Sequence, residues 1–252
     1  MNHSRIGDSN VVIVTGGTRG IGKAISEDFL KHGSIVYALY EKNELKATEF
    51  YDLMKIKYRN NINIIKADIT DKKIIDKIIS EIIQKNYKID VLVNNAGITR
   101  NKEFSEMSFA EWNAVIDVNL SSLYNITHPV IKCMKNNNFG RIINISSVNG
   151  HKGQSNESNY CATKAAMYGF TKSLAQELAP YDITVNTISP GYINTDLTAS
   201  LGNTELDRIL NKVPKKRFGT TYEVARIATF LADKDSGFIT GTDISVNGGL
   251  YM

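Results

Sequence analysis

The sequence predicts an α/β fold, namely a doubly wound parallel sheet of about seven strands with helices on both faces. Short β-branched segments alternate with longer amphipathic segments along the chain, and this alternation is typical of βαβ units in a parallel sheet. The 252 residues, 42% of them hydrophobic, can bury one core of that size. Only four prolines are present and no long linker divides the chain, so we expect one domain over residues 1–252.

The first half of the chain begins with an expected strand at 11–15 and an expected helix at 21–32. Ile21, Ile25 and Phe29 recur at helical spacing in that segment, and Gly33 follows it where a C-cap glycine is expected. The same criteria predict further strands at 35–40, 62–67 and 91–93. They predict further helices at 43–58 and 71–84.

The second half continues the alternation, with expected strands at 141–145, 184–188 and 243–246 and expected helices at 160–178 and 221–231. The segment 192–217 breaks the rhythm directly after Pro190-Gly191. It follows a strand end that would open onto a ligand crevice. Two interpretations of it remain open, a substrate lid and an ordinary peripheral helix pair.

Composition excludes several classes of protein. The net charge of +4 is modest and no long basic run is present, so nucleic acid is not an expected partner. Two cysteines cannot build a disulfide framework, and the four histidines lack ligand-spaced partners, so no metal site is expected. No apolar run is long enough to cross a membrane, and the first ten residues lack the apolar core of a signal peptide. We therefore expect a cytoplasmic protein.

A glycine-rich turn follows the first expected strand. Gly16, Gly20 and Gly22 have the spacing G-x-x-x-G-x-G. Glycine lets the backbone approach a pyrophosphate without a Cβ clash, and the following helix would point its free N–H groups at the phosphates. The turn lacks the Gly-Lys-Ser/Thr ending of a nucleoside-triphosphate loop. It predicts a dinucleotide site, with an unliganded tight turn as the structural alternative.

A tyrosine and a lysine stand four residues apart, at Tyr160 and Lys164, so they share one face of the expected helix. A nearby ammonium favours the phenolate and would lower the pKa of the tyrosine from its usual value of about 10. Ser147 lies thirteen residues earlier, at the end of an expected strand. Its hydroxyl could hydrogen-bond a substrate carbonyl, and the three side chains together indicate proton transfer at that carbonyl.

These motifs together resemble the short-chain dehydrogenase/reductase family, whose fold is Rossmann-like. The resemblance rests on an ordered set: Thr15-Gly-Gly-Thr-Arg-Gly-Ile-Gly22, Asn94-Asn-Ala-Gly97, Asn119, Ser147, Tyr160-x-x-x-Lys164 and Pro190-Gly191. Within that family, the segments Asn94–Arg100, Val118–Ser122 and Val246–Met252 are similar to 3-oxoacyl-[acyl-carrier-protein] reductases.

The resemblance implies a catalytic role for four residues. Tyr160 would protonate the carbonyl oxygen as hydride arrives, and Ser147 would hold and polarise that oxygen. Lys164 would lower the pKa of Tyr160 and bind the nicotinamide ribose. Asn119 would hold a water that feeds protons to Lys164.

The resemblance also implies which residues line the cofactor. They comprise Gly16, Thr18, Arg19, Gly20, Ile21 and Gly22 in the turn, Asp68 and Ile69 at the adenine, Asn95, Ala96 and Gly97 near the adenosine ribose and the floor of the site, and Pro190, Gly191, Ile193 and Thr195 at the nicotinamide, beside Tyr160 and Lys164.

Two signals disagree about the cofactor. Arg19 matches a position that contacts the 2′-phosphate of NADP in relatives, and a guanidinium suits phosphate. Glu41 lies about 20 residues beyond the glycines, where an acid commonly binds the ribose 2′-hydroxyl of NAD. The expected strand ends at Tyr40, which would leave Glu41 one step beyond, next to Lys42. The sequence favours NADP(H) and leaves NAD(H) open.

The expected function is NADPH-dependent reduction of a 3-oxoacyl thioester carried by acyl-carrier protein or CoA, in a homotetramer like those of the resembled reductases. The carrier stays open because Asn138 and Tyr181 are uncharged where those reductases have basic docking residues. Four nearby basic residues could substitute: Lys132, Lys135, Arg141 and Lys172. The alternatives are a dehydrogenase of a small alcohol, polyol or sugar and a non-catalytic dinucleotide-binding scaffold.

Overall fold

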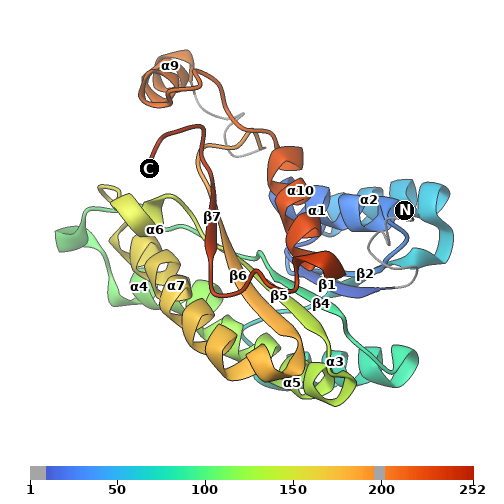
Figure 1. Cartoon of the computed structure of the whole chain (residues 1–252). Helices are drawn as coiled ribbons and strands as arrows, with labels where there is room; N and C mark the ends of the chain where they lie inside the picture. Colours follow the sequence, from blue (N-terminus) through green and yellow to red (C-terminus); the bar gives the residue numbers. More distant parts are fainter. Residues whose placement is uncertain (1–9, 196–201) are drawn as a thin grey trace.

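The computed structural model describes residues 10–195 and 202–252, and its core is a single seven-stranded sheet (Figure 1). The strand order is β3-β2-β1-β4-β5-β6-β7, and each neighbouring pair is parallel. The strands are β1 (Val11–Thr15), β2 (Ile35–Tyr40), β3 (Ile62–Lys66), β4 (Val91–Asn94), β5 (Gly140–Ile145), β6 (Ile183–Pro190) and β7 (Asp243–Val246). The expected doubly wound α/β fold is confirmed.

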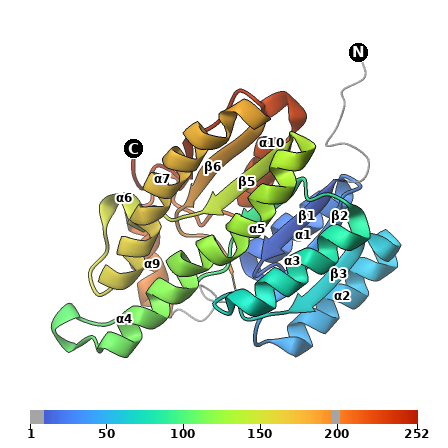
Figure 2. The same ribbon diagram turned by 90° about the horizontal axis from the view of Figure 1, so that it is seen from below.

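Helices cover both faces of this sheet. Those described are α1 (Gly20–Lys31), α2 (Glu44–Tyr58), α3 (Lys72–Asn86), α4 (Phe109–Ile116), α5 (Ser122–Asn137), α6 (Asn149–Lys152), α7 (Ser158–Leu178), α9 (Asn203–Lys212) and α10 (Thr221–Ala232). Figure 2 shows α3, α5 and α7 side by side across one face. None of the helices in the described ranges is both long and apolar enough to cross a bilayer.

The two faces have separate hydrophobic cores. On one face, apolar side chains of α1, α2 and α10 such as Phe29, Met54 and Ala228 pack together. On the other face, α3, α5 and α7 contribute side chains such as Ile79 and Val130. A parallel sheet buried on both faces needs apolar residues on both, which explains the fully buried sequence of β1.

Strand order reverses between β3 and β4, because β4 pairs with β1 on the side opposite β2. In open α/β sheets such a reversal leaves a crevice beyond the carboxyl ends of the strands, where ligands bind. Here the loops after β1 and β4 meet at that point. The predicted glycine turn and the Asn95 segment therefore share one edge of the sheet.

The chain between β4 and β5 was not assigned to particular helices from the sequence. It forms α4, a five-residue π-helical segment (Asp117–Ser121) and α5 without a break. Pro129 lies inside α5 and obscures its periodicity. A usable signal was present, since Ser108 and Glu111 form a capping box at the start of α4.

The segment predicted as either a lid or a helix pair, 192–217, lies partly outside the described residues, which omit 196–201. Its described part contains α9, and its two ends are joined by a parallel bridge between Ile193 and Gly219. Asn194 N donates to Gly219 O at 2.8 Å and Gly219 N donates to Tyr192 O at 2.9 Å. The segment therefore begins and ends at one fixed point beside β6.

Candidate active site

The turn after β1 requires glycine at several positions. Gly16 and Gly20 have φ of 61° and 53°, in the left-handed region that favours glycine. A Cβ on Gly22 would overlap the carbonyl oxygen of Gly16. Helix α1 begins at Gly20, and Arg19 precedes it as an exposed N-cap residue with no side-chain cap. An open turn at a helix N-terminus fits the pyrophosphate of a dinucleotide.

Thr15 and Asn95 lock this turn to the loop after β4. Thr15 Oγ1 accepts hydrogen bonds from the backbone N–H groups of Asn95 and Ala96, both at 2.9 Å. Asn95 Nδ2 donates to Thr15 O at 2.9 Å and to Gly16 O at 3.3 Å. The Asn95 amide therefore holds the floor of the crevice together. The predicted cofactor-lining residues did not include Thr15, although it is the first residue of the glycine motif.

The positions predicted at the nicotinamide end lie at and just beyond the carboxyl end of β6, and Thr195 among them approaches the glycine turn. Pro190 ends β6 and its carbonyl accepts from Val148 N at 2.9 Å. A Cβ on Gly191 would lie 2.9 Å from Asn247 Cα, so the strand end and the chain end touch there. Ile193 is buried, and Thr195 Cγ2 would lie 3.8 Å from a Cβ on Gly20.

The predicted adenine end has a local structural role. Asp68 Oδ1 accepts from the backbone N of Thr70 at 2.9 Å and from its hydroxyl at 2.7 Å, so Asp68 forms a turn after β3. Asn125 Nδ2 donates to Ile69 O at 3.1 Å, which ties that turn to α5. The Asp68 side chain is exposed, and its predicted contact with adenine stays a prediction.

Ser147, Tyr160 and Lys164 come together at the carboxyl end of β5. Ser147 is the second residue after the strand. Its Oγ accepts from Asn149 N at 3.1 Å, and its hydroxyl lies close enough to the Tyr160 phenol to lower the pKa of that group. Tyr160 is the third residue of α7, not the first as predicted. Lys164 Nζ lies 5.6 Å from the centroid of the Tyr160 ring and donates to Ile145 O at 2.7 Å. The predicted meeting of phenol, ammonium and hydroxyl is therefore present.

The pKa of Tyr160 shifts opposite to the direction that the sequence suggested. Burial raises it to about 12, and the hydrogen bond from the Ser147 hydroxyl offsets only part of that rise. Lys164 does not lower it here because its ammonium donates to a backbone carbonyl and lies over the ring. Burial lowers the pKa of Lys164 itself to about 8. At neutral pH, the site therefore holds a neutral phenol beside an ammonium that releases its proton more readily than that of an ordinary lysine.

Asn119 lies in the π-helical segment and is fully buried. Its Oδ1 accepts from Ile98 N at 2.8 Å, and its Nδ2 donates to Ile98 O at 3.0 Å and to Thr163 Oγ1 at 3.2 Å. Both amide hydrogens are thus used. A Cβ on Gly97 would lie 3.3 Å from Asn119 Oδ1 and 3.6 Å from Lys164 Nζ, so these three predicted residues share one wall.

The basic residues that the sequence suggested as substitutes for docking differ in their exposure and contacts. Arg141 is buried, with 1% of its surface exposed, so it cannot dock a carrier protein. The reason is local: its guanidinium donates to several backbone carbonyls that surround it. Lys135 Nζ lies 4.8 Å from the Tyr181 ring and 3.7 Å from a Glu177 carboxylate oxygen. Asn138 and Tyr181 lie at the amino ends of β5 and β6, opposite the catalytic side chains.

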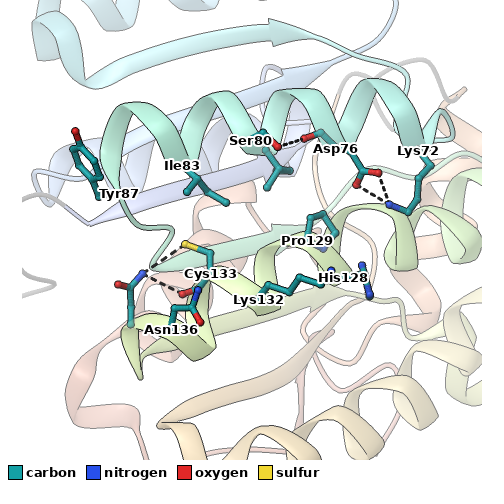
Figure 3. Close-up of a pocket in the computed structure, with 12 residues that line it drawn as sticks. Lys72, Asp76, Ser80, Ile83, Tyr87, His128, Pro129, Lys132, Cys133 and Asn136 are labelled. Carbon is teal, nitrogen blue, oxygen red and sulfur yellow. Dashed lines mark hydrogen bonds and ion pairs between the residues drawn. The ribbon is translucent and has the colours of Figure 1, made fainter.

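A hollow of about 450 Å³ lies between α3 and α5, away from the predicted catalytic residues (Figure 3). It is lined by side chains such as Lys72, Ile83 and Lys132 and includes none of the predicted site residues. A second hollow, of about 690 Å³, is bordered by His151, Asp243 and the chain end. His151 lies four residues beyond Ser147, so the second of these two hollows borders the loop that carries the catalytic hydroxyl.

Comparison with known proteins agrees with this geometry. The family model described as short chain dehydrogenase matches residues 10–206. The chain is 46% identical over 245 residues to an acetoacetyl-CoA reductase of Shinella zoogloeoides, which covers 97% of this chain and 99% of the relative. It is 45% identical over 246 residues to the acetoacetyl-CoA reductase of Cupriavidus necator (96% and 98% covered). It is 40% identical over 242 residues to a 3-oxoacyl-[acyl-carrier-protein] reductase of Haemophilus influenzae (96% and 98% covered).

Proposed function

Because the chain belongs to the short-chain dehydrogenase family and is an oxidoreductase of that family, we propose that it reduces the 3-oxo group of an acyl thioester with NADPH. The observation that carries the proposal is the meeting of Ser147, Tyr160 and the buried Lys164, whose Nζ lies 5.6 Å from the centroid of the Tyr160 ring. Relatives with reductase names cover nearly the whole chain. They support a thioester substrate.

The bound nicotinamide would supply the hydride to the carbonyl carbon. The residues of this chain would do the rest. The Ser147 hydroxyl would donate to the carbonyl oxygen, and Tyr160 would give that oxygen its proton as negative charge develops there. A phenol whose pKa is about 12 stays protonated throughout the physiological range. It is therefore ready to act as an acid, which suits the reductive direction.

Lys164 would restore the proton to Tyr160. A pKa of about 8 lets the ammonium release a proton more readily than an ordinary lysine does. Asn119 would act by position, because its side chain is committed to Ile98 and Thr163. The water predicted for the proton relay would then hydrogen-bond to a group other than the amide N–H groups of Asn119.

The preference for NADPH rests on the end of β2. That strand ends at Tyr40, so Glu41 stands one residue beyond it. A Glu41 carboxylate oxygen lies 2.9 Å from Lys42 Nζ, which reduces its repulsion of a 2′-phosphate. Arg19 is exposed at the start of α1 and could reach that phosphate. The remaining cofactor contacts stay predictions from the sequence.

We extend the proposal to assembly and location, with a homotetramer in the cytoplasm. Large aromatic side chains are exposed on α4 and α5, including Phe109 and Tyr124. Such surfaces often mark contacts between subunits. Mass measurement in solution tests the assembly, and a monomer at micromolar concentration would contradict it.

The test is reduction of acetoacetyl-CoA, followed by the loss of NADPH absorbance, beside the same acyl group on acyl-carrier protein and a panel of polyols and sugars. We expect turnover of both thioesters or of acetoacetyl-CoA alone. We also expect a higher kcat/KM with NADPH than with NADH. Tyr160→Phe should abolish turnover and leave NADPH binding intact. Activity on polyols alone would establish the small-alcohol alternative, and NADPH binding without any turnover would establish the scaffold alternative.

A further inference from the structure

A hydrogen-bonded chain outside the predicted site ends on Ser147. The Tyr168 hydroxyl lies 2.9 Å from Ser147 O and 3.0 Å from Ser189 Oγ. Ser189 Oγ lies 2.6 Å from Asp243 Oδ1, and Asp243 Oδ2 lies 2.8 Å from His151 Nε2. The chain therefore joins α7, β6, β7 and α6, and it leads back to within four residues of where it began.

The charge of Asp243 fixes which group donates. An ionised carboxylate only accepts hydrogen bonds, so the single hydroxyl hydrogen of Ser189 points to Asp243. Ser189 Oγ then has only lone pairs for Tyr168. Tyr168 is consequently the donor, and its single hydroxyl hydrogen is shared between two acceptors, Ser189 Oγ and the carbonyl oxygen of Ser147.

Two aromatic rings hold the far end of the chain. The His151 ring stacks on Tyr168, with centroids 4.2 Å apart and planes at 15°, and on Tyr251, at 5.3 Å and 5°. Figure 1 shows the C terminus above α6, beside the end of β7. A Cβ on Gly150 would come within 2.9 Å of the Tyr168 hydroxyl oxygen, so only glycine lets the turn approach so closely.

This arrangement differs from a hydrolytic triad. In such a triad the histidine contacts the serine hydroxyl and removes its proton. Here Asp243 lies between Ser189 and His151, so the imidazole is not placed to activate Ser189. The chain fastens a loop and has no nucleophile of its own.

The fastened loop is the one that carries the catalytic hydroxyl. Residues 147–153, which we call the α6 turn, contain Ser147, the Asn149 N–H that donates to its Oγ, and His151. Tyr168 holds the first residue of the α6 turn through its carbonyl, while Asp243 and the two rings hold His151. Small displacements of a catalytic group can lower the rate strongly.

We propose that Tyr168, Ser189, Asp243 and His151 form a positioning chain that holds the Ser147 hydroxyl at the Tyr160 oxygen, an inference that rests on the reductase activity proposed above. None of the four is a catalytic residue, because each acts through the α6 turn. Tyr168 follows Tyr160 and Lys164 at four-residue intervals, so the same face of α7 carries both the chemistry and its support.

The test begins with Tyr168→Phe, which removes the hydroxyl and keeps the ring that stacks on His151. We expect kcat for acetoacetyl-CoA to fall about tenfold. KM and the NADPH dissociation constant should stay within about twofold, because the thioester and dinucleotide contacts are untouched. Lys152→Gln is the matched control, since its ammonium donates to Gly153 O and Gln154 Oε1 on the surface, and it should leave kcat unchanged.

Two variants of Asp243 test the middle of the chain. Asp243→Leu should lower kcat about as much as Tyr168→Phe, whereas Asp243→Asn keeps an acceptor for Ser189 and should restore most of the rate. The double variant Tyr168→Phe/Asp243→Leu should be little worse than either single variant, because residues in one chain are not additive. If the fold losses in kcat of the two single variants multiply in the double variant, the proposed positioning chain is contradicted. An unchanged kcat in Tyr168→Phe would contradict it as well.

Amide hydrogen exchange keeps this inference separate from the reductase proposal. Amides of the α6 turn should exchange faster in Tyr168→Phe than in the wild type, and those of α10 should not change. If wild-type protein fails to reduce any thioester, the reductase proposal falls, and faster exchange would still support the fastening of the turn. Equal exchange in both proteins would overturn the fastening itself.

Discussion

The two ends of β5 each hold a buried cation, and the difference between them separates structure from chemistry. At the amino end, Arg141 donates to Gly140 O at 2.9 Å, to Asp182 O at 2.8 Å and to Asp233 O at 3.3 Å. At the carboxyl end, Lys164 Nζ donates to Ile145 O at 2.7 Å. No other oxygen partner of that ammonium is found in residues 10–195 and 202–252. A guanidinium has five N–H donors and an ammonium three, so Arg141 is well satisfied and Lys164 is not.

The surroundings deepen this contrast. Arg141 stacks on Phe139, with the guanidinium carbon 4.3 Å from the ring centroid. Burial lowers the pKa of Arg141, and the nearby Asp182 carboxylate offsets part of that effect. For Lys164 burial alone is the cause, and its pKa falls to about 8. A buried cation whose nitrogen atoms all donate hydrogen bonds, like Arg141, holds chain segments together. A buried cation that keeps N–H groups without oxygen partners in the described part of the chain, like Lys164 beside the crevice, is available for proton transfer.

The largest expected effect follows from removing the under-coordinated cation. Lys164→Met should lower kcat about 10²–10⁴-fold, the usual contribution of a positioned acid or base. It should leave the free energy of unfolding unchanged or raise it, because an apolar side chain needs no partners there. Steady-state kinetics and urea denaturation measure the two quantities. Lys172→Met, on the exposed side of the same helix, is the control, and a variant that unfolds would contradict the contrast.

Removing the coordinated cation should do the reverse. Arg141→Met removes a donor from the carbonyls of Gly140, Asp182, Asp233 and Lys234. The carbonyls of Asp182, Asp233 and Lys234 keep one backbone donor each. A buried carbonyl that is left without a donor costs about 1–3 kcal/mol of stability. The kcat of the fraction that remains folded should stay near wild type, because the chemistry lies at the other end of β5. Urea denaturation checks the first point, and a selective loss of kcat without loss of stability would sink the assignment.

The sequence indicated the fold and the three central side chains more fully than it indicated their electrostatics. The strand-helix alternation and the order of motifs depend on local patterns, which survive in a single sequence. Arg141 stands at the start of an expected strand, where a charged residue is ordinarily exposed. It is buried because segments 41 to 93 residues away in the sequence surround it. The direction of the Tyr160 pKa shift likewise depends on where the Lys164 ammonium points, which four-residue spacing does not specify.

The pH dependence of stability gives a smaller effect. The pKa of Lys164 is about 8 in the folded protein and about 10.4 when unfolded. The unfolded chain therefore binds more protons between these values, and stability rises with pH across that window. The gain is of the order of 3 kcal/mol by about pH 10. Comparison of wild type with Lys164→Met by urea denaturation at pH 7 and pH 9.5 isolates it, because the variant lacks the titrating group. Parallel pH profiles for the two proteins would mean that the ammonium is not destabilised by burial.

The smallest effect concerns an exposed cation with good geometry. Arg217 donates from both terminal nitrogens to Glu223, at 2.9 and 2.6 Å, and this pair lowers the pKa of Glu223 to about 2. Half of the Arg217 side chain surface is exposed, however, and water screens the attraction. Arg217→Gln should therefore cost less than about 1 kcal/mol by urea denaturation, although the 2.6 Å bond of Arg217 is shorter than any bond of Arg141. Glu223 also caps α10 through Thr220, so Glu223→Gln, which can still cap, serves as the partner variant. A loss as large as that in Arg141→Met would show that geometry outweighs burial, and the comparison between the two ends of β5 would then need another cause.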